Sequence, residues 1–209
     1  MLHGGLDIGT LELRAGPKGR SIRGRFPYNK WAVLSDGGTK GGRPKKERFA
    51  PGAFKYSLEA PDQDIALLAG HSFDRPLASK KTGTLTFEDG KEALTFEAEI
   101  SPEVAAISWV QDLFRLIEAG LSVGLSPGFR IPPPRAVPPD EAEKIEQEIV
   151  DAARGMHGAI LRTILQAILH ELSIVTRPAY DEAQVDLRSW QPNDAGVLVP
   201  RPQSILRYR

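Results

Sequence analysis

The sequence predicts a mainly β fold of the α+β class, with short strands and a few helices. The 209 residues include 20 glycines and 17 prolines, which interrupt regular structure often and favour strands joined by turns over a helical bundle. The pair Asp89-Gly90 separates two runs rich in strand-forming residues, the usual signal of a hairpin. A clear helix start is found at Ser101.

Composition excludes several classes of function. Lys plus Arg and Asp plus Glu number 27 each, so the net charge is zero and a broad nucleic-acid surface is not expected. Cysteine is absent, which rules out disulfides, zinc-thiolate sites and a cysteine nucleophile. No run approaches the ~18 apolar residues of a membrane span, and residues 1–10 lack a signal-peptide pattern. We therefore expect a cytoplasmic protein without a membrane partner.

Strands are expected over residues 6–14 and 21–28, joined by a turn at 16–19, and over residues 31–34. Residues 35–48 are polar and rich in glycine and lysine, and they predict a solvated loop. This stretch lacks the G-x-x-x-x-G-K-[ST] pattern of a phosphate-binding loop.

Further along, residues 50–58 predict a turn that enters a short helix. The apolar residues 65–68 predict a short strand that ends close to His71. Residues 85–88 and 93–100 are the two strands of the predicted hairpin.

The predicted helix has Ser101 as its cap, Pro102 in its first turn and Glu103 near its positive end. We expect it to run to Ala119 and to end at Gly120. Its apolar face is expected to contain Val104, Ile107, Leu113, Leu116 and Ile117.

Residues 121–131 predict a strand or elbow. A proline-rich and acidic stretch at about 131–156 predicts a mobile insertion, whose residues 140–151 form either a short solvated helix or a disordered excursion. Residues 159–175 fit helical spacing as well as buried strands. Their β-branched residues and the following proline favour strands.

The expected organisation is therefore one domain over residues 1–190, followed by an extension over residues 191–209.

Ser126 is flanked at short range by Gly124 and Gly128, which permit a tight backbone and close substrate approach. A serine hydroxyl becomes a nucleophile when a neighbouring base takes its proton and donors stabilise the resulting oxyanion. Ser126 can equally be an ordinary turn residue. Ser122 competes with it, because glycines at plus and minus two bring Ser122 closer to the G-x-S-x-G pattern.

His71, at the predicted end of a strand, is the candidate base, and it can equally be structural. Glu171 lies in an apolar run and would need a partner if buried, for which a protonated His71 is suitable. His170 is the alternative to Glu171 as the third member of a triad with Ser126 and His71. Neighbouring residues of a regular strand point to opposite faces, so only one of the two can face the site. His71 and Asp74 alone are weak evidence for a metal. We expect neither a metal nor a cofactor.

These segments together resemble the prohead (procapsid) maturation proteases of tailed bacteriophages, the type that processes HK97-like capsids. The matching segments occur in the order of that family. They are Glu47 to Phe54, Leu67 to His71 with Asp74 to Leu77, Gly83 to Leu85, Gly120 to Phe129, and Glu171 to Tyr180.

The resemblance implies an assemblin-like fold, a closed or partly closed antiparallel β-barrel flanked by a few helices. By the Ser-x-Gly-Phe match it implies Ser126 as nucleophile, His71 as base and Glu171 as acid. The related herpesvirus enzymes use a second histidine as the third member, which keeps His170 as an alternative. Pro127 has no N–H, so the oxyanion donor next to the nucleophile is missing. The amide of Gly128 and the loop bearing Arg177 are the remaining candidates.

The resemblance also implies a serine endopeptidase that cleaves scaffold segments of the major capsid protein and itself during procapsid maturation. Its partners would be the major capsid protein, that protein's scaffold segment, and further copies of this chain in a homo-oligomer such as a dimer. It would act in the host bacterial cytoplasm, inside the procapsid. A non-enzymatic scaffold or structural capsid-assembly protein with the same fold is the alternative, and a histidine/carboxylate metal hydrolase is a third reading.

Overall fold

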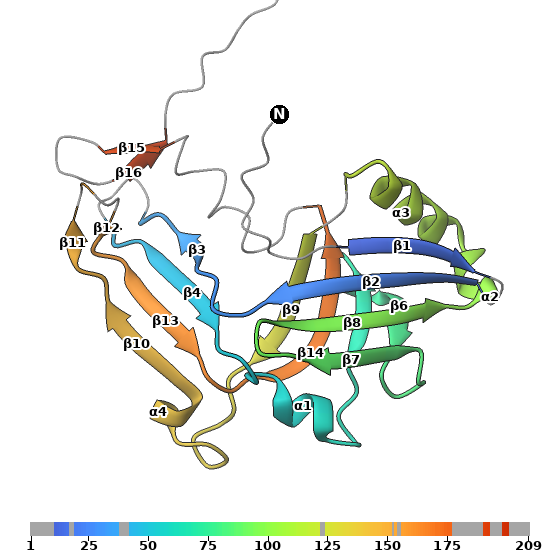
Figure 1. Ribbon diagram of the computed structural model, residues 1–209, viewed down its shortest axis with the longest axis horizontal. Helices are drawn as coiled ribbons and strands as arrows, with labels where there is room; N and C mark the ends of the chain where they lie inside the picture. The colour runs from blue at the N-terminus through green and yellow to red at the C-terminus, as the bar shows by residue number, and fades with distance from the viewer. Residues whose placement is uncertain are drawn as a thin grey trace, which may run out of the picture.

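The computed structural model describes residues 11–16, 19–37, 42–121, 124–151, 153, 156–176, 190–192 and 198–200. In these residues the chain is mainly β, as predicted, with three four-stranded sheets and a few short helices (Figure 1). None of the described sheets closes on itself. The expected barrel is therefore not confirmed: two of the sheets pack against each other, and a third lies beside them.

The first sheet has the strand order β1-β2-β8-β7 and is antiparallel throughout. Both hairpins that the sequence predicted are present in it: Gly16 pairs with Gly19, and Asp89 pairs with Leu94. Its strands are β1 (Leu11–Gly16), β2 (Gly19–Pro27), β7 (Leu85–Asp89) and β8 (Ala93–Ile100).

The second sheet, of order β6-β5-β14-β9, carries the candidate site. β14 lies between β5, to which it is parallel, and β9, to which it is antiparallel. Strands, and not a helix, therefore form after residue 159. The strands of this sheet are β5 (Ala66–Ala69), β6 (Ser72–Ser79), β9 (Gly124–Arg130) and β14 (Ile168–Val175).

One apolar core fills the space between these two sheets. Phe96 and Leu94 enter it from the first sheet, and Leu125 and Leu172 enter it from the second. Gly24 leaves room for this packing, because a Cβ there would lie 2.3 Å from the ring of Phe96, its neighbour in the first sheet, and 3.0 Å from Leu125 of the second sheet. The second sheet thus has one face on the core, and its other face is available for polar side chains.

Helices close the ends of the core. α1 (Lys55–Glu59) follows the predicted turn. The helix expected from Ser101 to Ala119 is two helices, α2 (Pro102–Ala105) and α3 (Ser108–Glu118), because the backbone at Ile107 is extended, with ψ of 132°. This break turns Ile107 out of the expected apolar face and leaves it exposed. Gly120 ends α3 in a left-handed conformation, as predicted.

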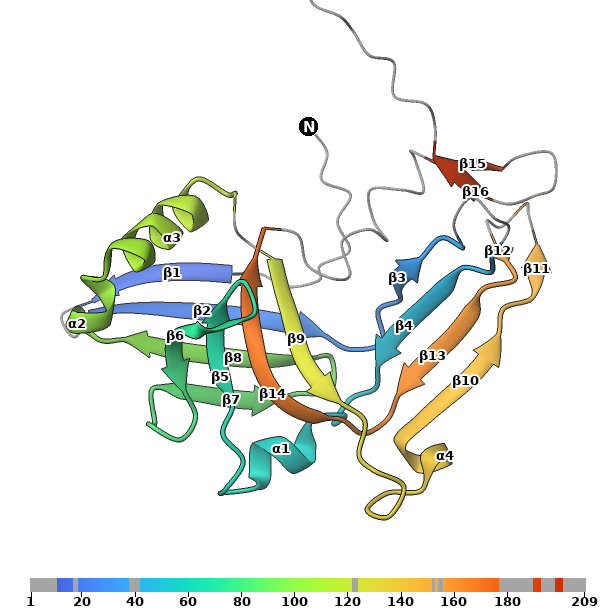
Figure 2. The ribbon, with the colours of Figure 1, turned by 180° about the vertical axis from the view of Figure 1, so that it is seen from behind.

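The third sheet, of order β10-β13-β4-β3, extends to one side of the packed pair (Figures 1 and 2). It corrects two expectations, because part of the predicted solvated loop is β4 and part of the predicted mobile insertion is β10. Two charged side chains of β4 form ion pairs: buried Glu47 pairs with Arg162 of β13 at 2.9 Å, and Lys46 pairs with Glu148. Its strands are β3 (Ala32–Ser35), β4 (Lys45–Phe49), β10 (Glu143–Gln147) and β13 (Ile160–Ile164), and α4 (Pro139–Ala142) precedes β10.

Two small ribbons complete the described structure. β11 (Val150–Asp151) pairs with β12 (Met156–His157), and β15 (Trp190–Pro192) pairs with β16 (Leu198–Pro200). Across the described ranges, no helix has the length and apolar character needed to cross a membrane.

Candidate active site

His71 lies at the tip of a tight hairpin between β5 and β6. Ala69 pairs with Ser72, so the connecting loop is the two residues Gly70 and His71. Both have positive φ, 64° and 59°, the pattern of a type I′ turn. Histidine adopts this left-handed region at a cost on the order of 1 kcal/mol, so other contacts must hold it there.

A β-bulge in β14 directs Glu171 toward His71. Leu169 pairs with Phe129 and Glu171 pairs with Gly128, so His170 is an extra residue without a partner on β9. An extra residue reverses the facing of every side chain that follows. Leu169 and Leu172 both face the core for this reason, and Glu171 faces the opposite side, where its Oε1 lies 2.7 Å from Nδ1 of His71.

Ser173 completes a closed ring of hydrogen bonds around this pair. The backbone N–H of His71 donates to Oγ of Ser173 at 2.9 Å, and that hydroxyl donates to Oε2 of Glu171 at 2.6 Å. Ser173 and Glu171 are both buried, whereas the side chain of His71 is 47% exposed. The ring therefore fixes both the unusual backbone of His71 and the direction of the carboxylate, and it leaves one edge of the imidazole exposed.

Sequence reasoning missed Ser173 as a site residue. A signal for it existed, because residues two apart on a strand share a face. A serine two places after a candidate acid is therefore in position to contact the same carboxylate.

Ser126 lies on β9 directly opposite Ser173 on β14, so both side chains point to the same face of the sheet. Gly128, the next residue of β9 on that face, lies under the carboxylate of Glu171. A Cβ on Gly128 would be 2.1 Å from Oε1 of Glu171. The face therefore carries the four residues Ser126, Gly128, Glu171 and Ser173 side by side, and His71 lies over them from the turn.

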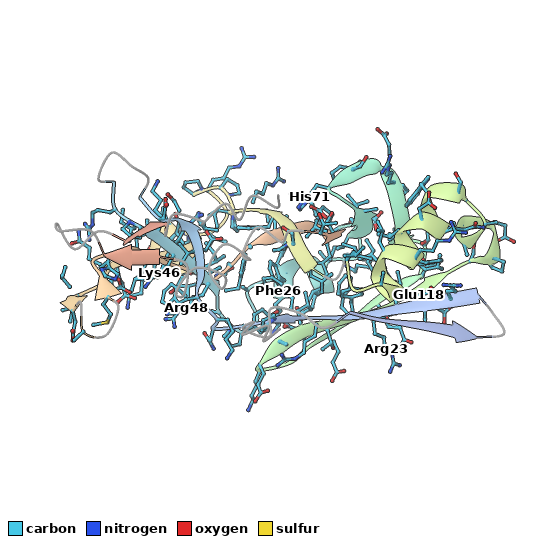
Figure 3. The ribbon with its side chains drawn as sticks, turned by 90° about the horizontal axis from the view of Figure 1, so that it is seen from above. Arg23, Phe26, Lys46, Arg48, His71 and Glu118 are labelled. Atoms are coloured by element: carbon cyan, nitrogen blue, oxygen red, sulfur yellow. The ribbon has the colours of Figure 1, made fainter. Side chains whose placement is uncertain are left out.

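The order of the layers is visible from above (Figure 3). His71 lies on the side of the second sheet away from β1 and β2, and Phe26 lies between the two sheets. The site is thus built on the face of the sheet that the core does not use.

Ser126 itself is only 2% exposed. Among the described residues, no hydrogen bond joins Ser126 to His71. The structure thus brings the predicted serine to the same face as the His71–Glu171 pair without making the contact that proton transfer requires.

Of the other predicted site residues, only His170 is described, and it does not join this cluster. Ser122 and Arg177 lie outside the described residues. His170 contacts Gln63, whose Nε2 is 3.5 Å from its Nδ1. Burial lowers the pKa of His170, and the positive charge of Arg130 lowers it further. Of the two candidates for the third member, the structure places Glu171 against His71.

Chemically, the arrangement is a general base with an oriented imidazole. A carboxylate on Nδ1 holds the tautomer whose Nε2 can accept a proton, and it stabilises the imidazolium that results. No group of three or more His, Asp or Glu side chains suited to holding a metal ion occurs within the described part of the chain.

Comparison with protein families shows to which family of proteins the chain belongs. The profile of the caudovirus prohead serine proteases matches residues 28–195, more than half of the chain. The chain belongs to that family. Membership implies a serine protease that takes part in capsid maturation inside the procapsid and interacts with capsid proteins. No curated protein and no solved structure gives a significant match.

Proposed function

We propose that the chain is a serine endopeptidase in which Ser126 is the nucleophile, His71 the base and Glu171 the residue that orients the base. The observation that carries this proposal is the 2.7 Å contact between His71 and a buried Glu171 on the sheet face that also bears Ser126. The family match supports the reaction type. The relation to herpesvirus assemblin stays a prediction.

In the proposed reaction, Nε2 of His71 takes the proton of Ser126 as its Oγ attacks the scissile carbonyl carbon. The imidazolium then gives that proton to the leaving amine, and the peptide bond breaks to form an acyl-enzyme. A water molecule, deprotonated in turn by His71, releases the acyl group and restores the serine. Glu171 accepts the hydrogen bond from Nδ1–H of His71 and so holds the imidazole in place.

The oxyanion needs donors other than the residue after Ser126, because Pro127 has no N–H. The amide of Gly128 and the loop of Arg177 remain the proposed donors. Glu171 lies beside Gly128, and its negative charge opposes an oxyanion there. Protonation of His71 in the same step offsets that charge, so the Gly128 donor is effective only while His71 is an imidazolium.

Cleavage also requires that Ser126 become accessible. We propose that the described conformation is a resting form and that a small movement of β9 or of the His71 turn brings Oγ of Ser126 to Nε2 of His71. An open cavity of about 480 Å³ already borders the turn, with Gly70, His71, Arg75, Leu113 and Val175 among its lining residues. Substrate that enters there would meet the exposed edge of the imidazole.

The proposed substrates are the scaffold segment of the major capsid protein and the chain itself, cut inside the procapsid in the host cytoplasm. We retain a single domain over residues 1–190 and propose the extension 191–209 as a site of self-cleavage. Mass spectrometry of this chain and of a co-expressed capsid precursor, before and after maturation, tests these substrates. Shortened capsid protein and shortened protease are expected.

The burial of Ser126 favours one competing function, a non-enzymatic capsid-assembly protein with the same fold. The same experiment separates the two. If procapsids assemble around this chain and the capsid precursor in them remains uncut, the assembly function is supported and the protease function is overturned.

A further inference from the structure

β10 is an edge strand of the third sheet, and its outer side lacks a partner in the part of the chain that the structure describes. It lies at the outer margin of that sheet, beyond β13 (Figure 2). Ile145, at its centre, is 64% exposed. A free strand edge with an exposed apolar side chain favours pairing with another strand.

The backbone of β10 shows which peptide groups are free. Glu148 N–H donates to the carbonyl of Ala159, and Leu165 N–H donates to the carbonyl of Ala142. Hydrogen-bonded positions alternate along an antiparallel pair, so the even-numbered residues from 142 to 148 bond toward β13. The N–H and C=O groups of Ile145 and Gln147 therefore point outward, to the unpaired side.

The side chains of β10 are complementary to a second copy of the same strand. When two antiparallel strands pair about Ile145, each Ile145 lies opposite the other, and each Lys144 lies opposite the Glu146 of the second copy. Lys144 and Glu146 lie on the same face and already pair within one chain at 3.0 Å. The pairing would thus form a square of four alternating charges on one face and an Ile145–Ile145 contact on the other.

We propose that two copies of this chain associate through β10, in antiparallel register about Ile145, to form a two-fold symmetric dimer. The two four-stranded sheets would then continue as one sheet across the symmetry axis. Pairing of two five-residue strands buries much less than a standard interface of roughly 1,600 Å². The dimer is therefore weak, with a Kd on the order of 0.1 mM, and is favoured by the crowding of copies inside a closed shell.

This inference specifies the homo-oligomer that the resemblance in sequence implied, and it does not depend on the catalytic residues. Sedimentation velocity over a concentration series, with the Ser126→Ala chain to prevent self-cleavage, tests it. The weight-average mass should rise from 22.9 kDa toward twice that value. A mass that stays at 22.9 kDa up to about 0.5 mM, well above the proposed Kd, would overturn the dimer.

Charge reversal tests the register. Lys144→Glu or Glu146→Lys alone turns both intermolecular pairs into like-charge pairs and should weaken association on the order of tenfold. The double variant, with both charges exchanged, restores the two opposite-charge pairs between the copies and should associate as the parent does. An equimolar mixture of the two single variants should associate more tightly than either alone. Equal association of all variants would overturn the proposed register.

Thermal unfolding followed by circular dichroism serves as the folding control, because Lys144 and Glu146 are exposed. The transitions of all variants should coincide at low concentration. If the chain remains monomeric yet still processes a capsid precursor, the dimer fails and the protease proposal stands.

Discussion

Replacing Glu171 with glutamine tests the role of the carboxylate with little change in shape. Glu171 accepts hydrogen bonds from Nδ1 of His71 at 2.7 Å and from Oγ of Ser173 at 2.6 Å. A glutamine must present its NH₂ group to one of these partners. If that group faces His71, the imidazole is forced into the tautomer with its proton on Nε2, which cannot act as the base.

The size of the effect follows from the distance between the charges. An imidazolium and a carboxylate whose charge centres lie about 4 Å apart attract by about 4 kcal/mol at an effective dielectric constant near 20. The His71 side chain is 47% exposed, so solvent reduces this to about 2–3 kcal/mol. That loss corresponds to a rate about 30- to 150-fold lower.

The assay is the rate of cleavage of a co-expressed capsid precursor, measured by intact-mass spectrometry at successive times. Thermal unfolding of Glu171→Gln should stay near that of the parent, because the neutral side chain keeps the same volume. Cleavage within threefold of the parent rate, by a folded variant, would refute the role of Glu171. His170→Gln serves as the matched control and should leave the rate unchanged.

Three further predictions concern the support of the site. Ser173→Ala should lower kcat more than it raises KM, because it removes the hydroxyl that holds His71 and Glu171 in place. Ser173→Thr keeps the hydroxyl and should recover most of the rate. Equal kcat in all three proteins would contradict the positioning role. Gly128→Ala should abolish cleavage, because its Cβ would lie 2.1 Å from Oε1 of Glu171. Gly24→Ala, whose Cβ would meet the ring of Phe96 in the core, should lower the melting temperature and retain activity. An active Gly128→Ala chain together with an inactive Gly24→Ala chain would refute the close packing at Glu171. Burial raises the pKa of Asp64, but hydrogen bonds from Lys81 N–H, the Ser79 hydroxyl and Ile65 N–H outweigh it and hold this pKa below its usual value. A carboxylate whose pKa is lowered in the folded state stabilises that state at a pH above its unfolded pKa, and this stabilisation is lost as the pH falls. Asp64→Asn should therefore have a lower free energy of unfolding than the parent at pH 7, and the difference should vanish in acid. A difference that urea unfolding shows to be independent of pH would contradict this.

Much of the second sheet could be predicted from sequence because its signals are local. The apolar run before His71 predicts β5, and the β-branched residues before Pro178 favour strands over a helix in the segment that contains β14. β4 and β10 could not be predicted in this way. Their charged residues resemble solvent-exposed loops until partners such as Arg162, 115 residues from Glu47, are brought across the sheet.

The candidate site was predictable in its residues and less so in its geometry. Alternation along a regular strand left Glu171 and His170 as alternatives, and the bulge at His170 places Glu171 on the site face. A bulge is set by pairing with β9 and has no local signature here. Ser173 was within reach of the same reasoning, since it lies two residues beyond the acid.

The most direct measurement of the central claim is processing of a co-expressed capsid precursor by the Ser126→Ala chain, with Ser122→Ala as its matched control. Intact-mass spectrometry of the assembled particles reports both precursor and protease. We predict uncut precursor with Ser126→Ala and normal processing with Ser122→Ala, both chains being folded. Normal processing by Ser126→Ala, or its loss only with Ser122→Ala, would contradict the account.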